Sequence, residues 1–248
     1  DTDRSRGLGD VYKRQFMDSD DYYQPTFLED MYNACVANDC DISYCSFYFY
    51  FPYNGLRIPL PFTCRTAVYE SRQALNLLIR DKSMHHFAWN KLYKRSLFLE
   101  NDVTYTQMYF EDVATSPKLY YHAKRVAVTS KPLYNYTRRR GSILKSMNAK
   151  KINDFIRTLG YTRNFLEEAD DFRAFRKSFN KFARRMKMVN WYSVLRLHVI
   201  TLNFKGMWKN IKNSNRSIRY FMSEDYRPHK GQPILPFPVI QPQRRGSK

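Results

Sequence analysis

The chain has 248 residues, of which 43% are hydrophobic and 17% aromatic, and its formal net charge is +19. This apolar content suffices for one sizeable core and argues against a disordered chain. The sequence has no run of 18 or more apolar residues, so we expect no membrane-spanning helix, and its N-terminus lacks the order of a signal peptide. We therefore expect a cytoplasmic protein.

The basic charge is concentrated in the C-terminal part. Residues 1–150 carry 21 Lys and Arg against 16 Asp and Glu, whereas residues 151–248 carry 21 against 7. A cationic segment attracts nucleic acid, anionic lipid or phosphorylated substrates through the same Coulomb force, so charge alone does not choose among them.

The four cysteines are Cys35, Cys40, Cys45 and Cys64, and they form no CxxC pair. Structural zinc sites use tighter paired spacings. We expect reduced, mostly buried cysteine side chains.

The first part of the chain is expected to alternate between helices and strands. Residues 1–15 have no apolar periodicity, and we interpret them as a non-native or flexible lead-in outside the fold. Apolar spacing predicts a helix over 26–38, and an aromatic run predicts a buried strand over 41–51. Proline and Asn-Gly signals predict a loop over 52–61, and a helix is expected over 66–80.

The middle of the chain predicts shorter elements. Residues 88–100 are typical of a short strand followed by a helical turn. A helix should begin near Glu111, with Pro117 kinking or interrupting it. Two short strands are expected over 125–129 and 132–137.

The remaining chain predicts helices and then a tail. Helical segments are expected over 150–168, 171–188, 191–203 and 205–212. A proline-rich, polar composition after residue 223 predicts a mobile tail. The whole pattern predicts an α/β domain over 16–148, a basic helical extension over 149–223 and a flexible tail over 224–248.

An acidic motif follows the apolar pair Phe16–Met17. On extended backbone, residues two apart project to the same side, which directs Asp18 and Asp20 to one place. Two convergent carboxylates repel each other unless a cation or solvent offsets them, and Mg²⁺ or Mn²⁺ suits such oxygen ligands while keeping places free for phosphate. The alternative is a solvated acidic turn in which Asp21 caps the next helix.

Four motifs occur in the order found in one enzyme family. They are FMDSDDYY (16–23), WNKLYKRSLF (89–98), FEDV (110–113) and PLYNYTRRRGSI (132–143). Together they resemble the DxD-type, Trp-x-Lys-x-Tyr-x-Arg, Glu-Asp and Tyr-x-Tyr-Arg…Ser-Ile segments of family 2 glycosyltransferases. The resemblance implies a GT-A fold, which is a Rossmann-like mixed sheet, and relatives in bacterial capsule, exopolysaccharide or lipopolysaccharide synthesis.

The resemblance also implies roles for the acidic residues. Asp18 and Asp20 would bind the metal and the diphosphate end of the donor, with Asp21 beside them. Asp112 would be the general base, and Glu111 competes for that role because neighbouring helical side chains point about 100° apart. Without the resemblance, the last two acids would be an ordinary acidic helix start.

Four further residues receive roles from the resemblance, each with an alternative. Arg138 and Ser142 would close over the donor diphosphate, although an arginine run is usually a solvated turn. Trp89 would form an acceptor-side wall or lie in the core. Lys91 would lie on the acceptor side or reach phosphate, or else flank a strand in solvent.

The implied reaction is the inverting transfer of a sugar from a nucleotide-sugar donor to a saccharide or lipid-linked acceptor. In the family, an N-terminal βαβ unit before the DxD-type motif binds the nucleotide base. Only fifteen residues precede Phe16, so we expect an incomplete, N-terminally truncated domain that binds donor weakly or not at all and is inactive alone.

Two alternatives remain for the basic part. Phe172, Phe175, Phe179 and Phe182 recur at helical spacing beside cations, as in a helix lying peripherally on the anionic inner face of the plasma membrane, or as in an ordinary core helix. A nucleic-acid-binding module is the other alternative, but no zinc-finger, RNP or GXXG signature supports a nucleic-acid partner.

Overall fold

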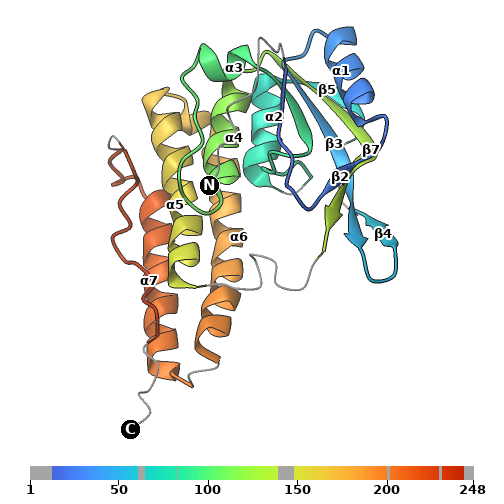
Figure 1. Ribbon diagram of the computed structural model, residues 1–248. Helices are drawn as coiled ribbons and strands as arrows, with labels where there is room; N and C mark the ends of the chain where they lie inside the picture. The colour runs from blue at the N-terminus through green and yellow to red at the C-terminus, as the bar shows by residue number, and fades with distance from the viewer. Residues whose placement is uncertain are drawn as a thin grey trace. The chain divides into compact units, whose positions relative to one another are not determined.

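The computed structural model describes residues 13–60, 65–81, 83–138, 148–199, 202–228 and 231–242. The chain forms two compact units, one of residues 1–105 and 115–140 and the other of residues 106–114 and 141–248. The first unit contains the sheet, and the second is mainly helical (Figure 1). An α/β region followed by helices is therefore confirmed.

The described strands of the first unit form one mixed sheet. Its main path runs β1-β6-β3-β7-β2, with β4 paired to β3 and β5 paired to β7. Strands β3 and β7 are parallel, and the other pairs are antiparallel. The strands are β1 (Lys13–Gln15), β2 (Tyr22–Tyr23), β3 (Ile42–Phe51), β4 (Leu56–Pro59), β5 (Ala67–Glu70), β6 (Lys91–Lys94) and β7 (Arg125–Thr137).

Helix α1 covers part of this sheet (Figure 1). It buries Phe27, Met31 and Cys35, which recur every four residues and so share one helical face. Phe27 and Met31 join a core cluster with residues of β3, β6 and β7. The helices that precede β7 in the chain are α1 (Phe27–Ala37), α2 (Ser71–Arg80), α3 (Ser96–Leu99) and α4 (Glu111–His122).

The lead-in interpretation is wrong for residues 13–15, which form β1. They pair with β6 in antiparallel register from Lys13 to Gln15. The Gln15 side-chain amide also donates to the carbonyl of Trp89 at 2.7 Å. Three residues are too short for a periodicity signal, and the pairing depends on a strand almost 80 residues away. Residues 1–12 lie outside the described part.

The helix expected over 66–80 is shorter than predicted. Residues 67–70 form β5, in which Val68 pairs with Ala127 of β7. Val68 and Tyr69 favour extended backbone, and Glu70, at ψ 151°, remains extended where α2 begins. Cross-strand pairing therefore overrides the helical pattern in its first turn.

One strand replaces the two expected over 125–137. Strand β7 is continuous, but its register against β3 shifts between Cys45 and Phe47. Pro132 lies opposite Ser46 within this irregularity. A proline has no N–H for the ladder, so a bulge is where a strand accepts one without breaking.

The loop expected over 52–61 contains a strand. Residues 56–59 form β4, which folds back on β3 with Phe51 opposite Leu56. Gly55 has a φ of +68°, a left-handed conformation that glycine adopts without strain. The Asn-Gly signal therefore marked a hairpin turn.

Helix α4 begins at Glu111 as predicted, but Pro117 does not interrupt it. The residues just before the proline, Ala114, Thr115 and Ser116, are buried. The Ser116 hydroxyl also donates to the His86 carbonyl at 2.8 Å. This anchoring offsets the backbone hydrogen bond that the proline cannot make.

The second unit contains a three-helix arrangement in which each helix contacts the other two. The helices are α5 (Ala149–Glu168), α6 (Phe172–Val199) and α7 (Phe204–Met222). Helix α6 is continuous where two helices were expected, because no Gly or Pro separates residues 188 and 191. Helix α7 extends ten residues beyond the predicted end at 212.

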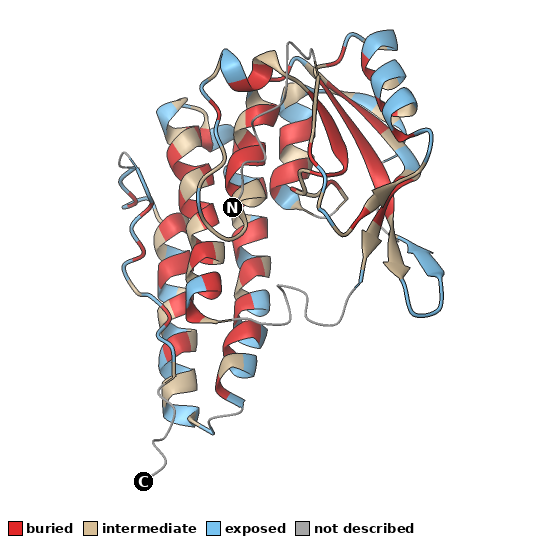
Figure 2. Cartoon of the chain, in the orientation of Figure 1, coloured by how far each residue is buried: buried red, intermediate tan, exposed pale blue. Residues whose placement is uncertain are grey.

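The phenylalanine stripe of α6 belongs to the core. Phe172, Phe175, Phe179 and Phe182 are at most 6% exposed. Buried residues line one side of α6 and exposed residues the other (Figure 2). Membrane contact through these four side chains is therefore wrong, and the core-helix alternative holds.

The mobile-tail prediction is wrong for residues 231–242, which form a strap against α5 and α7, whereas residues 243–248 lie outside the described part. Asn153 of α5 exchanges two hydrogen bonds with the backbone of Val239, at 2.7 and 2.9 Å. Asn210 of α7 does the same with Ile240, at 3.1 and 2.7 Å. These side-chain amides act as strand partners for an extended chain, a role that composition does not reveal.

Three cysteines behave as expected. Cys35, Cys40 and Cys45 are free and buried. Burial raises the pKa of Cys45 to about 12, which keeps its thiol protonated. Cys64 lies outside the described residues.

Candidate active site

The acidic turn joins β1 to β2 in the first unit. The turn closes through the Asp21 N–H, which donates to the Asp18 carbonyl at 3.1 Å. Phe16, just before it, is 5% exposed and packs edge-on against Tyr93 and Tyr105. The buried ring anchors the start of the turn, so the acids follow a fixed piece of backbone.

Asp21 is buried and held by two residues of β7. Its carboxylate accepts from the Tyr134 hydroxyl and from the Thr137 N–H, both at 2.8 Å. Helix α1 instead has Thr26 at its N-cap. The alternative of a solvated turn with Asp21 as the helix cap is therefore wrong, and Asp21 ties the turn to the sheet.

The three carboxyl groups interact electrostatically. The pKa of Asp21 is raised to about 6, mainly by burial and further by the charges of Asp20 and Asp18, while its two hydrogen bonds oppose the rise. Asp18 and Asp20 are only partly buried. A cation at their outer side would relieve the repulsion that the fold concentrates here.

Trp89 is buried beneath this turn and does not line an exposed surface of the site. It is 6% exposed and stacks on Phe87 at 4.8 Å, on Tyr134 at 4.3 Å and on Tyr136 at 5.5 Å between ring centroids. Its ring therefore supports the tyrosine that binds Asp21. The core alternative holds for Trp89, and its expected role as an acceptor wall is corrected.

Lys91 is fully buried, which corrects all three positions expected for it. Its ammonium donates to the carbonyl of His85 and to the side-chain oxygen of Asn90 at 2.8 Å each, and also to the carbonyl of Phe87. It lies 5.0 Å from the centroid of the Tyr44 ring. These acceptors replace water around the charge, so Lys91 stabilises the loop before β6.

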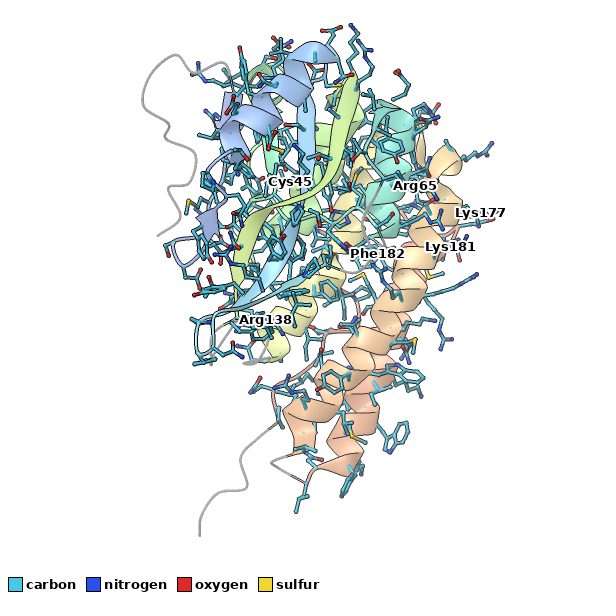
Figure 3. The ribbon with its side chains drawn as sticks, turned by 90° about the vertical axis from the view of Figure 1, so that its right-hand side faces the viewer. Cys45, Arg65, Arg138, Lys177, Lys181 and Phe182 are labelled. Atoms are coloured by element: carbon cyan, nitrogen blue, oxygen red, sulfur yellow. The ribbon has the colours of Figure 1, made fainter. Side chains whose placement is uncertain are left out.

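Two arginines lie near the acidic turn. Arg138 directly follows Thr137 at the end of β7 (Figure 3), and its guanidinium lies 5.4 Å from the Phe49 ring. Arg57 of β4 lies 5.7 Å from the ring of Tyr22, the residue after Asp21. Both arginines are exposed, so their charges are available to a ligand beside the carboxylates.

Glu111 and Asp112 open α4 and belong to the second unit. The Asp112 carboxylate accepts the Val113 N–H at 2.8 Å, which places it at the positive end of the helix dipole. Phe110 before them has a φ of +64°, rare for a bulky residue, and its ring packs on Phe155 of α5. The shared cleft with Asp18 and Asp20 stays a prediction.

The structure thus brings Asp18, Asp20, Asp21 and Arg138 together in the first unit, whereas Ser142 lies outside the described residues. Sequence reasoning missed Tyr134, Thr137 and Arg57. The Tyr-x-Tyr spacing was a usable signal, because Tyr134 and Tyr136 of one strand point to the same face and both stack on Trp89.

The described residues contain no group of three or more His, Cys, Asp or Glu side chains arranged to hold a metal ion. Mg²⁺ needs fewer protein ligands when a substrate supplies phosphate oxygens, since one or two carboxylates then suffice. Asp18 and Asp20 fit that arrangement, because Asp21 is already bonded to β7 and the other two are partly exposed.

Comparisons with known proteins point to one class of enzyme. Residues 15–102 match the family described as Glycosyl transferase family 2. The chain is 26% identical over 155 residues to the cholesterol galactosyltransferase of Borreliella burgdorferi, covering 58% of this chain and 43% of that protein. It is 28% identical over 141 residues to glycosyltransferase GlyA of Streptococcus pneumoniae, covering 54% and 20% respectively. The chain spans less than half the length of these relatives.

The fold has a counterpart among solved structures. S. aureus TarS superposes with a TM-score of 0.61 at 19% identity, over 88% of this chain and 35% of that one. The likeness establishes a mixed α/β sheet of the GT-A type followed by helices. Residues 15–102 thus resemble glycosyltransferase family 2, and the relatives and the fold are of the same class.

Proposed function

We propose that this protein transfers a sugar from a nucleotide-sugar donor to an acceptor hydroxyl, with inversion at the anomeric carbon. The observation that carries the proposal is the acidic turn, in which Asp21 is clamped to β7 while Asp18 and Asp20 stay partly exposed. Such a turn suits a diphosphate, whose charge a divalent cation neutralises as it leaves. The residues that would hold Mg²⁺ or Mn²⁺ are Asp20 and Asp18.

Arg138 and Arg57 are proposed to bind the donor diphosphate. A guanidinium presents a planar set of donors that matches phosphate oxygens, and both side chains are exposed beside the acidic turn. The family resemblance pointed to Arg138 and Ser142, whereas Arg57 comes from the structure.

Asp112 is proposed as the general base. The acceptor oxygen would attack the anomeric carbon as its proton passes to the Asp112 carboxylate, while the bond from that carbon to the diphosphate oxygen breaks. The helix dipole and the Val113 N–H favour the ionised carboxylate, which makes Asp112 available to accept a proton at neutral pH. Glu111 is the second candidate.

The acceptor is proposed to be a saccharide or a lipid-linked saccharide of bacterial surface polysaccharide synthesis. One relative is named for transfer to cholesterol, which supports a lipid among the acceptor classes. The acidic turn and the family resemblance favour a transferase over the nucleic-acid-binding alternative.

Calorimetric titration with a nucleoside diphosphate and Mn²⁺ tests the donor site. We expect weak binding to the unchanged chain and at least about a further tenfold loss in Asp20→Asn and in Arg57→Gln. Glu29→Gln, an exposed acid on α1, is the matched control and should bind normally. Equal binding by Asp20→Asn and the control would contradict the proposal.

Asp112→Asn separates binding from chemistry. It should bind the nucleoside diphosphate as the unchanged chain does and should lose at least about a hundredfold of any hydrolysis or transfer of a nucleotide sugar that the unchanged chain performs. Undiminished turnover in Asp112→Asn with loss in Glu111→Gln would assign the base to Glu111.

A further inference from the structure

The end of the α6–α7 pair exposes large apolar side chains. The exposed fractions include 73% for Met188, 60% for Tyr192, 64% for Phe204 and 65% for Trp208. We call this set the aromatic patch. Its members are Met188, Trp191, Tyr192, Leu195 and Val199 of α6, Leu202 of the connection, and Phe204 and Trp208 of α7.

Four of the five members on α6 form one continuous stripe. Met188, Tyr192, Leu195 and Val199 follow at four, seven and eleven residues, which places them on one helical face. That face lies opposite the buried stripe that begins at Phe172, since buried and exposed residues divide α6 lengthwise (Figure 2). The stripe therefore points away from the core of its own unit.

The members on α7 join this stripe at the seam between the helices. The Trp191 indole N–H donates to the Asn215 side chain at 2.9 Å. Phe204 and Trp208 precede Asn215 by eleven and seven residues, so they share its face of α7. Because α6 and α7 are antiparallel neighbours (Figure 1), the end of one stripe meets the start of the other.

The charge around the aromatic patch has one sign. Helix α6 carries eight Lys or Arg and helix α7 carries five, and neither carries an acidic residue. Lys205, Lys209 and Lys212 are exposed beside Phe204 and Trp208. Nearer the N-terminus of α6, Lys177 and Lys181 point outward from the helix (Figure 3).

We propose that the aromatic patch binds peripherally to the surface of an anionic phospholipid bilayer. Trp and Tyr favour the interface between lipid and water, Leu, Val, Met and Phe enter the acyl boundary, and the surrounding lysines attract anionic headgroups. Within the described residues, no helix has the length and apolarity needed to cross a bilayer. This inference does not depend on the proposed catalytic residues.

Charge and side-chain chemistry disfavour two other binding partners for the aromatic patch, a second copy of this chain and nucleic acid. A second copy of this chain would bring the same dense positive charge against itself, and repulsion would oppose the contact. Nucleic acid matches the charge, but aliphatic side chains such as Leu195, Val199 and Leu202 offer no stacking surface for bases.

Sedimentation of the full chain with phospholipid vesicles tests the proposal. We expect binding to vesicles that contain phosphatidylglycerol and little binding to pure phosphatidylcholine. Phe204→Glu with Trp208→Glu should weaken binding about a hundredfold or more, because two aromatic side chains no longer enter the bilayer. Leu28→Glu with Val36→Glu on α1 is the matched control, since both are more than half exposed, and it should bind normally.

A second variant tests the charge without changing the aromatic residues. Lys205→Gln, Lys209→Gln and Lys212→Gln together should weaken binding roughly a hundredfold, at about fivefold per lysine. Retained binding in both variant sets, or no binding by the unchanged chain, would overturn the proposal.

Tryptophan fluorescence locates the contact. The chain has three tryptophans, and Trp89 is buried whereas Trp191 and Trp208 are exposed. Emission should shift to shorter wavelength when anionic vesicles are added, and the shift should shrink in Trp208→Phe. The same shift on addition of RNA, with none on addition of vesicles, would overturn the proposal. So would a dimer that forms without lipid and that is dissociated by the double substitution Phe204→Glu with Trp208→Glu.

Discussion

The hydroxyl of Tyr134 donates to the carboxylate of Asp21 at 2.8 Å, although the two residues are 113 positions apart in the chain. The same hydroxyl accepts the N–H of Asp18 at 3.4 Å, and the ring stacks on Trp89. One side chain thus positions both ends of the acidic turn. Tyr134 connects the family's aromatic segment to its acidic motif.

Tyr134→Phe should destabilise the fold and weaken donor binding together. The buried Asp21 carboxylate would lose one of its two described hydrogen bonds, at a cost of about 1–3 kcal/mol. Urea unfolding and calorimetric titration measure the two effects. Tyr136→Phe, which stacks on the same tryptophan, is the control and should change both by much less.

Lys91→Met should destabilise the fold by about 2–4 kcal/mol, because the carbonyls of His85 and Phe87 and the amide oxygen of Asn90 would lose their buried donor. The control is Lys94→Met on the same strand, where the side chain is one-third exposed and its ammonium pairs with Asp41 at 3.4 Å. Its cost should be under about 1 kcal/mol. Equal unfolding midpoints for both variants would refute a structural role for Lys91.

Gly160→Ala should loosen the strap. A Cβ at this position of α5 would lie 2.4 Å from Pro233 of the strap and 2.7 Å from the Phe221 ring of α7. The clash should cost about 1–3 kcal/mol, which outweighs the gain in helix propensity. Hydrogen exchange should rise at Val239 and Ile240 while β3 stays protected. Unchanged exchange at those two amides would show that the strap does not depend on this close approach.

The helical unit should lose stability on acidification through His198. Both polar atoms of the Asn210 amide are oriented by the strap backbone at Ile240, so the amide nitrogen faces His198 Nε2 at 2.9 Å and the ring nitrogen must accept. Burial lowers the pKa of His198 below its usual value of 6.5, against a weaker opposing effect from the backbone of Asn203.

The sign of this dependence follows from the lowered pKa. Above the unfolded value of 6.5 the ring is neutral in both states, and its contribution is fully present. As the pH falls, the unfolded chain binds the proton first, so stability decreases. Thermal unfolding between about pH 7.5 and pH 5.5 should show a smaller decrease in His198→Gln, which keeps an acceptor for Asn210. A variant that follows the unchanged chain over this range would exclude His198 as the source.

Local features of the sequence were sufficient for much of the fold. Helix α1 was visible as apolar spacing over 26–38, and the start of α4 near Glu111 was also predicted. Errors arose where pairing partners are remote. Residues 13–15 and 67–70 became strands because β6 and β7 offered free edges, and short segments take their conformation from such partners.

The sequence by itself predicted the resemblance to family 2 glycosyltransferases, through four motifs in order, and the acidic motif with Asp18 and Asp20 after an apolar pair. Only the tertiary structure decided which polar groups are buried. In the structure, Lys91 and Asp21 are buried and Trp89 lies under the acidic turn. The exposed apolar face of α6 begins at Met188, whereas its phenylalanines are buried. Residues 231–242 are hydrogen-bonded to two helices. Burial and hydrogen bonding depend on groups that distant segments bring together, and the local residue pattern does not contain that information.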